Sequence, residues 1–173
     1  DFEVTGAENF PAVPHVALWK HGSAWETFAQ FLIGPPKVIV LKRELFLIPF
    51  FGWGLAQLRS IAINRGAGAS AVNQVVTQGT ARLQDGLSVL VFPEGGRSRS
   101  GRVEVESAAY GVGRLVTALP GCRVLCVYLR GEGQTGYSDA PARGERFRPL
   151  FASLEPKTEH AGMRGSLAIT RQI

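Results

Sequence analysis

Cysteine is scarce in this sequence. Only Cys122 and Cys126 occur among its 173 residues, and both fall inside one predicted strand. Pairing them would close a very short loop within extended backbone, which the geometry of a disulfide disfavours. They also lack the spacing of zinc ligands, so neither a disulfide framework nor a zinc finger is expected. We expect reduced thiols and a reducing compartment.

Long hydrophobic runs are also missing. No uninterrupted apolar stretch reaches the roughly 20 residues that a membrane-spanning helix needs, and no signal peptide is visible. The sequence starts with Asp1 instead of methionine, which leaves room for an N-terminal membrane-associating segment that this chain lacks. The absence of an anchor in residues 1–173 is therefore weak evidence about the whole protein.

The composition is that of a globular, basic protein. Hydrophobic residues make up 45% of the chain, which is enough to bury a core in a single domain spanning residues 1–173. The formal net charge is +5 and the isoelectric point about 9.7. This balance favours an anionic partner, and composition alone leaves open nucleic acid, phosphorylated small molecules and an acidic membrane.

Strand-like apolar runs alternate with helix-like stretches, which predicts an α/β fold with a central, mostly parallel sheet flanked by helices. The predicted strands are 13–18, 37–41, 61–63, 87–92 and 124–129, and residues 146–150 are expected to be extended. The predicted helices are 24–31, 69–84 and 107–118. Proline and glycine interrupt the apolar stretch 43–58, where we expect broken helix and turns.

The motif HGSAWE places a histidine after the first predicted strand and a carboxylate in the next helical turn. His21 can act as a general base near neutral pH, and Glu26 on its other ring nitrogen would fix the tautomer and stabilise the imidazolium. The same residues fit a capping box, with Ser23 as the N-cap and Glu26 reaching back to its N–H. Ser23 lacks the nucleophile-elbow context of a serine hydrolase. Capping and catalysis both stay open here.

The turn FPEGGRSRSG follows another predicted strand. Gly95 and Gly96 allow backbone N–H groups to approach an anion closely, and Arg97 and Arg99 can each bind phosphate through two hydrogen bonds. We interpret Glu94 as a group that orients an arginine or a substrate hydroxyl. The alternative interpretation of the whole turn is a solvated basic loop.

Cations follow two further predicted strands. Arg65 comes after strand 61–63, and Lys42 and Arg43 come after strand 37–41. Open α/β sheets bind ligands beyond the carboxyl ends of their strands. A single arginine is ordinarily a surface residue, but three strand ends with cations and one with a histidine predict an anion-binding site.

Taken together, these blocks resemble the glycerolipid acyltransferase family of the 1-acyl-sn-glycerol-3-phosphate acyltransferase type. The resemblance rests on the His-x-x-x-x-Asp/Glu motif at 21–26, on KRELFLIPFFGWGLAQLRSIAINR at 42–65, and on FPEGGRS at 92–98. Order and spacing agree over residues 13 to about 130. Two departures stand out: Gly96 replaces the usual threonine, and Cys126-Val127 stand where the family usually has a proline.

The resemblance implies roles for individual residues. His21 would be the general base and Glu26 its partner. The residues implied in substrate binding are Lys42, Arg65, Glu94, Gly95, Gly96, Arg97 and Ser98, with the cations on a phosphate group. No metal and no cofactor is implied. The donor is an acyl thioester, which is already activated, so the reaction needs no nucleophilic serine or cysteine.

The implied activity is transfer of a fatty acyl group from acyl-CoA or acyl carrier protein to the hydroxyl of a lysophospholipid, in phospholipid biosynthesis. The default acceptor is 1-acyl-sn-glycerol-3-phosphate. The resemblance places the enzyme at the cytoplasmic face of a membrane, held peripherally or by a segment outside this chain, with no nucleic-acid partner. The net charge and the apolar segment Leu45–Leu58 predict binding to anionic membranes.

Two other functions remain open from the sequence. A thioesterase or hydrolase would use the same His21–Glu26 pair to activate water. A basic nucleic-acid-binding module would use the net charge and arginines such as Arg102, but the chain carries no recognised binding motif of that kind.

Overall fold

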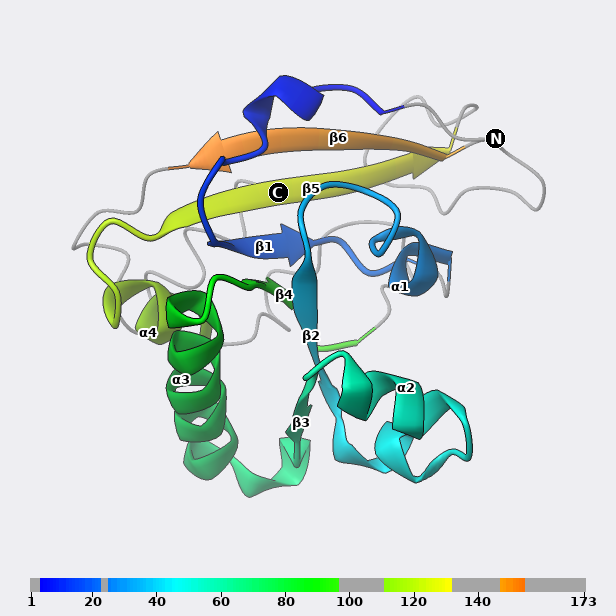
Figure 1. Ribbon diagram of the computed structural model, residues 1–173, viewed down its shortest axis with the longest axis vertical. Helices are drawn as coiled ribbons and strands as arrows, with labels where there is room; N and C mark the ends of the chain where they lie inside the picture. Colours follow the sequence, from blue (N-terminus) through cyan, green and yellow to red (C-terminus); the bar gives the residue numbers. More distant parts are fainter. Residues whose placement is uncertain (1–3, 23–24, 97–110, 132–146, 155–173) are drawn as a thin grey trace.

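The computed structural model describes residues 4–22, 25–96, 111–131 and 147–154 (Figure 1). The strands are β1 (His15–Trp19), β2 (Lys37–Lys42), β3 (Ile61–Ile63), β4 (Ser88–Val91), β5 (Arg123–Gly131) and β6 (Phe147–Leu154). The helices are α1 (Trp25–Ala29), α2 (Phe51–Gln57), α3 (Ala69–Gln84) and α4 (Gly111–Thr117). Short 3-10 turns are η1 (Ala7–Asn9), η2 (Arg43–Leu47) and η3 (Arg65–Ala67).

The strands form one sheet in the order β3-β2-β4-β1-β5-β6. The first five strands of that order run parallel, and β6 pairs antiparallel with β5 at the edge. β1 lies inside the sheet, between β4 and β5. The predicted α/β fold with a mostly parallel central sheet is therefore confirmed.

Most predicted elements are present, with shifted ends. The helix at 69–84 and the strand at 61–63 have the predicted bounds, and the stretch 43–58 is broken into η2 and α2 as expected. β1 starts two residues later than predicted because Pro14 has no N–H to give to a sheet. The extended segment predicted at 124–129 belongs to the longer β5, and the described part of the segment predicted at 146–150, which begins at Phe147, belongs to the longer β6. Of the helix predicted at 107–118, the described part begins at Gly111.

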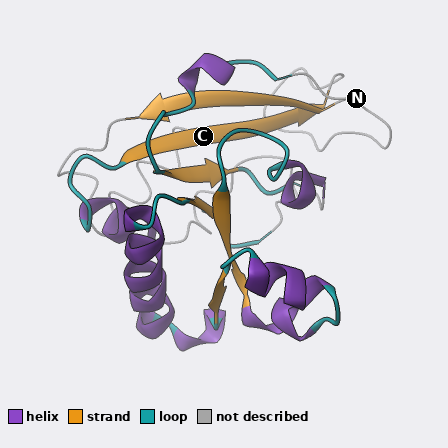
Figure 2. Ribbon diagram, in the orientation of Figure 1, coloured by secondary structure: helices purple, strands orange, loops and turns teal. Residues whose placement is uncertain are grey.

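Two apolar layers cover the two faces of the sheet, since successive side chains of a strand point to opposite faces. On one face Val16 and Leu18 of β1 pack in a cluster with residues of α3 and α4. On the other face Ala17 and Trp19 pack in a cluster with residues of α1 and α2. Figure 2 shows helices on both sides of the central strands.

Two glycines permit close packing around the sheet. A Cβ atom at Gly79 of α3 would lie 2.8 Å from Cδ1 of Leu115 on α4, so the two helices meet closely there. A Cβ atom at Gly52 of α2 would overlap the carbonyl of Phe46 in η2. The segment from η2 to α2 therefore folds back on itself as a compact unit.

The helices are short, and the longest in the described ranges is α3 with 16 residues. Within those ranges no helix has both the length and the hydrophobicity to cross a bilayer. Both cysteines carry free thiols, as expected. Burial raises the pKa of the Cys126 thiol to about 12, so it stays protonated at neutral pH.

Candidate active site

Predicted site residues from three strand ends lie at one edge of the sheet. The strands β1, β2, β3 and β4 run parallel, so their carboxyl ends share that edge. His21 follows β1, Arg65 follows β3 and Glu94 follows β4. This is the edge where open α/β sheets bind ligands.

The pair His21 and Glu26 is formed. Nδ1 of His21 donates to Oε1 of Glu26 over 2.7 Å. The Glu26 side chain is 1% exposed, whereas that of His21 is 17% exposed, so the carboxylate is held inside and the imidazole reaches the surface. A carboxylate only accepts hydrogen bonds, so in the neutral ring the proton lies on Nδ1 and Nε2 carries a lone pair that can accept a proton.

The turn after β4 holds the same histidine from a second side. The rings of Phe92 and His21 stack with centroids 4.2 Å apart and an interplanar angle of 25°. Oε2 of Glu94 accepts a hydrogen bond of 3.2 Å from the backbone N–H of His21. Glu94 is buried, as is Phe92. Ring and backbone of His21 are thus both fixed by residues more than 70 positions away in the chain.

The capping box expected for Glu26 involves Ser23, which lies outside the described residues, as do Arg97, Ser98, Arg99 and Arg102. The Oε1 atom of Glu26 accepts a hydrogen bond from the imidazole of His21. The His21–Glu26 hydrogen bond expected of a catalytic pair is therefore formed.

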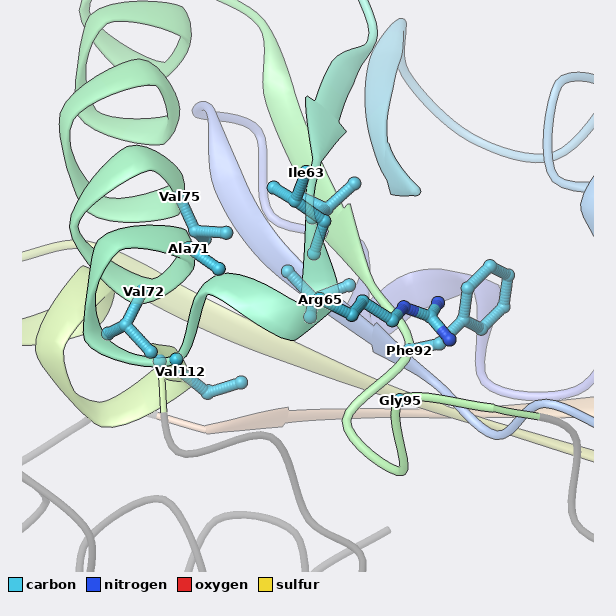
Figure 3. Close-up of a pocket in the computed structure, with 12 residues that line it drawn as sticks. Ile63, Arg65, Ala71, Val72, Val75, Phe92, Gly95 and Val112 are labelled. Carbon is cyan, nitrogen blue, oxygen red and sulfur yellow. The ribbon is translucent and has the colours of Figure 1, made fainter. Parts of the chain in front are cut away.

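Arg65 lines a pocket next to this pair. The side chain of Asn64 accepts from the N–H of Gly66, which fixes the η3 turn that carries Arg65. In Figure 3 the guanidinium extends toward Phe92. Burial lowers the pKa of Arg65, and the negative charge of Glu44 acts in the opposite direction. An arginine remains charged under these conditions, so the site keeps a cation available for an anionic group.

The pocket itself is mostly apolar and has a volume of about 170 Å³. It opens between the sheet and α3, with contributions from the turn after β4 and from α4 (Figure 3). The lining residues are Val40, Ile63, Arg65, Gly68, Ala71, Val72, Val75, Val91, Phe92, Gly95, Gly111 and Val112. An apolar wall with one cation near its mouth fits a molecule that has a hydrocarbon part and an anionic part.

Three further predicted site residues, Gly95, Gly96 and Lys42, lie in the described ranges. Gly95 lines the pocket with φ 71°, and its N–H donates to the carbonyl of Phe92, so this N–H is used by the turn itself. Gly96 follows it, with open space where a Cβ would lie. Lys42 is exposed at the end of β2 and does not line the pocket. Within the described ranges no group of His, Cys, Asp and Glu side chains has the composition of a metal site.

Sequence reasoning missed two features of the site. One is the stacking of Phe92 on His21, for which an aromatic residue at a strand end was the available signal. The other is Lys20, which is 3% exposed. Its N–H donates to the carbonyl of Val127, and its Nζ lies 5.4 Å from the centre of the Tyr128 ring. The signal for Lys20 was its position directly before His21.

Comparison with known sequences finds acyltransferases. The sequence model of a family described as "Acyltransferase" matches residues 1–130. A 1-acyl-sn-glycerol-3-phosphate acyltransferase of Pseudomonas aeruginosa is 50% identical over 104 residues, which are 59% of this chain and 40% of the relative. A chloroplastic enzyme of the same name from Arabidopsis thaliana is 28% identical over 134 residues, 76% of this chain and 36% of the relative. The chain thus spans about two fifths of these curated relatives.

Comparison with solved structures finds the same fold. The crystal structure of a 1-acyl-sn-glycerophosphate acyltransferase from Thermotoga maritima superposes with a TM-score of 0.68. The match covers 99% of this chain and 68% of that chain, at 19% sequence identity. At this identity the likeness concerns the arrangement of strands and helices.

Proposed function

Because the chain belongs to the acyltransferase family, we propose that it transfers a fatty acyl group from an acyl thioester to the hydroxyl of a lysophospholipid. The acceptor we propose is 1-acyl-sn-glycerol-3-phosphate, and the donor is acyl-CoA or acyl carrier protein. The observation that carries this proposal is the His21–Glu26 pair, with Nδ1 bound to a buried carboxylate beside an apolar pocket. In this role residues 1–173 form the acyltransferase domain.

The chemistry follows from the tautomer of His21. Nε2 removes the proton of the acceptor hydroxyl as its oxygen attacks the thioester carbonyl. The tetrahedral intermediate then collapses, the C–S bond breaks, and the imidazolium returns the proton to the leaving thiolate. Glu26 stabilises the imidazolium in between, as the carboxylate of a catalytic triad does. A positioned base of this kind contributes typically about 10² to 10⁴-fold to the rate.

We assign the acceptor phosphate to Arg65 and Arg97, and we keep Lys42, Gly96 and Ser98 as further residues proposed to bind substrate. Arg65 supports this assignment because it brings a cation to the mouth of a pocket that is otherwise apolar. An arginine grips a phosphate through two parallel hydrogen bonds. Glu94 is assigned a different part, since its carboxylate holds the backbone of His21. Gly95 forms the turn between them.

We place the enzyme at the cytoplasmic face of a membrane, bound peripherally or through a segment outside this chain. The net charge of +5 supports attraction to anionic headgroups. A lipid acceptor also resides in the bilayer, so the catalytic pair has to work at its surface.

The test is an acceptor panel with an isotope-labelled acyl donor, read by lipid mass spectrometry. We expect labelled phosphatidic acid from 1-acyl-sn-glycerol-3-phosphate, and no transfer by a folded His21→Ala variant. Each donor is offered separately, as acyl-CoA and as acyl carrier protein. Donor consumption that is independent of any acceptor would instead identify a thioesterase, and normal turnover by His21→Ala would remove His21 from the mechanism.

A further inference from the structure

Exposed apolar side chains are concentrated in the part of the chain that contains α1, η2 and α2. Among the described residues, every large hydrophobic side chain that is exposed, except Val13, lies between residues 28 and 58. The most exposed are Leu32 at 80%, Leu47 and Phe50 at 79%, and Trp53 at 64%. An apolar surface of this extent on one side of a domain is ordinarily an interaction site.

These side chains belong to one continuous surface. Phe28 on α1 contacts Phe51 on α2, with ring centroids 6.2 Å apart. Phe50 packs edge-to-face on Trp53 at 5.1 Å. The inward sides of both helices are already used, because they pack on the sheet. We call the outward surface, formed by Phe28, Phe31, Leu32, Leu47, Ile48, Phe50 and Trp53, the α1–α2 apolar face; Figure 1 shows both helices on the same side of the molecule.

One residue of this face is held there at a conformational cost. Phe50 has φ 63° and ψ −52°, and the N–H of Phe51 donates to the carbonyl of Pro49 over 2.7 Å. This is a γ-turn with positive φ, which is rare and strained for a residue with a side chain. Glycine would adopt it readily. Packing in the core does not explain a phenylalanine here, because the residue is 79% exposed and its ring packs on Trp53, which is itself exposed.

We propose that the α1–α2 apolar face docks on the surface of an anionic phospholipid bilayer and so holds the His21–Glu26 pair at the lipid boundary. This inference rests on the proposed function, in which the acceptor is a lipid. Phenylalanine and tryptophan are side chains that settle at the interface between water and hydrocarbon.

Charge and position both favour a bilayer as the occupant. Lys42 and Arg43 are exposed where β2 passes into η2, the turn that ends at Leu47 of the face, and they can meet anionic headgroups. The face is also continuous with the site, because α1 carries both Phe28 and the buried Glu26 that binds the base. Docking through this face therefore brings the lipid and the catalytic pair together.

The experiment measures partitioning onto sonicated vesicles, with phosphatidylcholine alone compared with an equal mixture of phosphatidylcholine and phosphatidylglycerol. We expect the wild-type chain to float with the mixed vesicles. The double variant Leu32→Ser/Trp53→Ser should partition at least about 100-fold more weakly, because each buried apolar side chain is worth about a factor of ten or more. Val13→Ser is the matched control: Val13 is 52% exposed but precedes β1, at the opposite end of the sheet from His21, and should partition like the wild type.

Phe50→Gly separates docking from folding. Glycine relieves the strained turn, so the midpoint of thermal unfolding should be unchanged or higher, while partitioning falls by about tenfold. A merely structural role for Phe50 predicts the reverse pattern. Turnover of a short-chain acceptor that stays monomeric in water should be unchanged in all these variants.

Several results would overturn the proposal. Wild-type protein that does not bind mixed vesicles, or variants that bind as well as the wild type, would remove the bilayer as occupant. Dimers in sedimentation velocity that the double variant dissociates would show that a second copy covers the face. Vesicle binding requires no acyl donor, so a protein that binds as expected but transfers no acyl group would contradict the proposed function alone.

Discussion

At the scale of single residues, the site is built around restraint of one imidazole. Glu26 binds Nδ1, Phe92 covers the ring, and Glu94 holds the backbone N–H. The two carboxylates therefore act on different parts of His21. Of the two carboxylates, Glu26 is hydrogen-bonded to the ring, so in the proposed mechanism it directly stabilises the charge that the ring acquires during proton transfer.

Replacement of each carboxylate by its amide should separate these roles. Glu26→Gln removes the charge that supports the imidazolium, and we expect kcat to fall by at least about 100-fold. Glu94→Gln still offers an oxygen to the His21 N–H, so kcat should fall by less than about tenfold, with the acceptor KM unchanged. Steady-state kinetics over a range of pH, with each substrate varied in turn, measures both.

The opposite results are equally informative. A normal kcat in Glu26→Gln, accompanied by lower stability, would mean that Glu26 serves as a helix cap. A raised acceptor KM in Glu94→Gln with an unchanged kcat would mean that Glu94 binds the acceptor and does not act through His21.

At the scale of elements, the start of β2 stabilises the end of the α1 segment. Lys37 is 6% exposed, and its Nζ donates to the carbonyls of Gln30 at 2.8 Å and Ile33 at 2.6 Å. These carbonyls follow the helix that carries Glu26. Burial lowers the pKa of Lys37 to about 8. The Lys37 ammonium thus binds carbonyls just after the C-terminal end of α1, and the first turn of the same helix carries Glu26, the partner of His21.

Lys37→Met should destabilise the fold by about 1–3 kcal/mol, because it leaves two carbonyls without their donor. Lys42→Met, at the exposed end of the same strand, is the control and should change the free energy of unfolding by less than about 0.5 kcal/mol. Urea denaturation at pH 7 measures both. In the wild type, Lys37 loses its proton near pH 8 in the native state but only near pH of about 10.4 in the unfolded chain. The free energy of unfolding should therefore rise between these two pH values. Equal stability of Lys37→Met and Lys42→Met at pH 7 would contradict the proposed role of Lys37.

Element positions could be read from the sequence where local chemistry determines them. The bounds of α3 were predictable because Gly66 and Gly68 precede it and Gly86 follows it, with apolar residues at helical spacing between them. The extension of β5 through Gly131 was not, because its partner β6 supplies the hydrogen bonds and lies in a segment with weak periodicity. The sequence predicted that the segment 43–58 is broken by turns. It did not predict which of its side chains are buried, because that depends on contacts with α1, such as the contact between Phe28 and Phe51.

At the scale of the whole molecule, stability should depend on pH through a buried histidine far from the site. His15 is fully buried in the centre of the sheet, and its Nδ1 donates to the carbonyl of Val13. Among the described residues its Nε2 has no hydrogen-bond partner. Burial lowers the pKa of His15, and the charge of Lys37 lowers it further.

The native state therefore keeps His15 neutral, whereas the unfolded chain binds a proton below pH of about 6.5. The contribution of His15 to the free energy of unfolding should therefore be constant above pH of about 6.5. Below that pH the free energy of unfolding should fall by up to about 1.4 kcal/mol per pH unit. His15→Gln should flatten this part of the profile between pH 6.5 and 5, whatever its effect at pH 7. An unchanged slope in the variant would assign acid sensitivity to the carboxylates.

The order of the strands in the sheet could not be predicted from the sequence. Periodicity indicates where strands are, but the order β3-β2-β4-β1-β5-β6 is decided by pairings between distant segments. The meeting of His21, Arg65 and Glu94 at one edge was predicted because parallel strands share their carboxyl edge. The contact of Glu94 with the His21 backbone was not, since it depends on β4 lying directly beside β1.

The central place of β1 also determines when the active site can form during synthesis. β1 is synthesised before its neighbours β4 and β5, which begin at Ser88 and Arg123, and the intervening β2 and β3 do not pair with it. Its fully apolar stretch from Val16 to Trp19 must therefore stay without a strand partner until β4 has been made, and without its second partner until β5 has been made. Such late, non-local pairing folds slowly and exposes strand edges to aggregation. His21 is thus among the first functional residues to be synthesised and among the last to become functional.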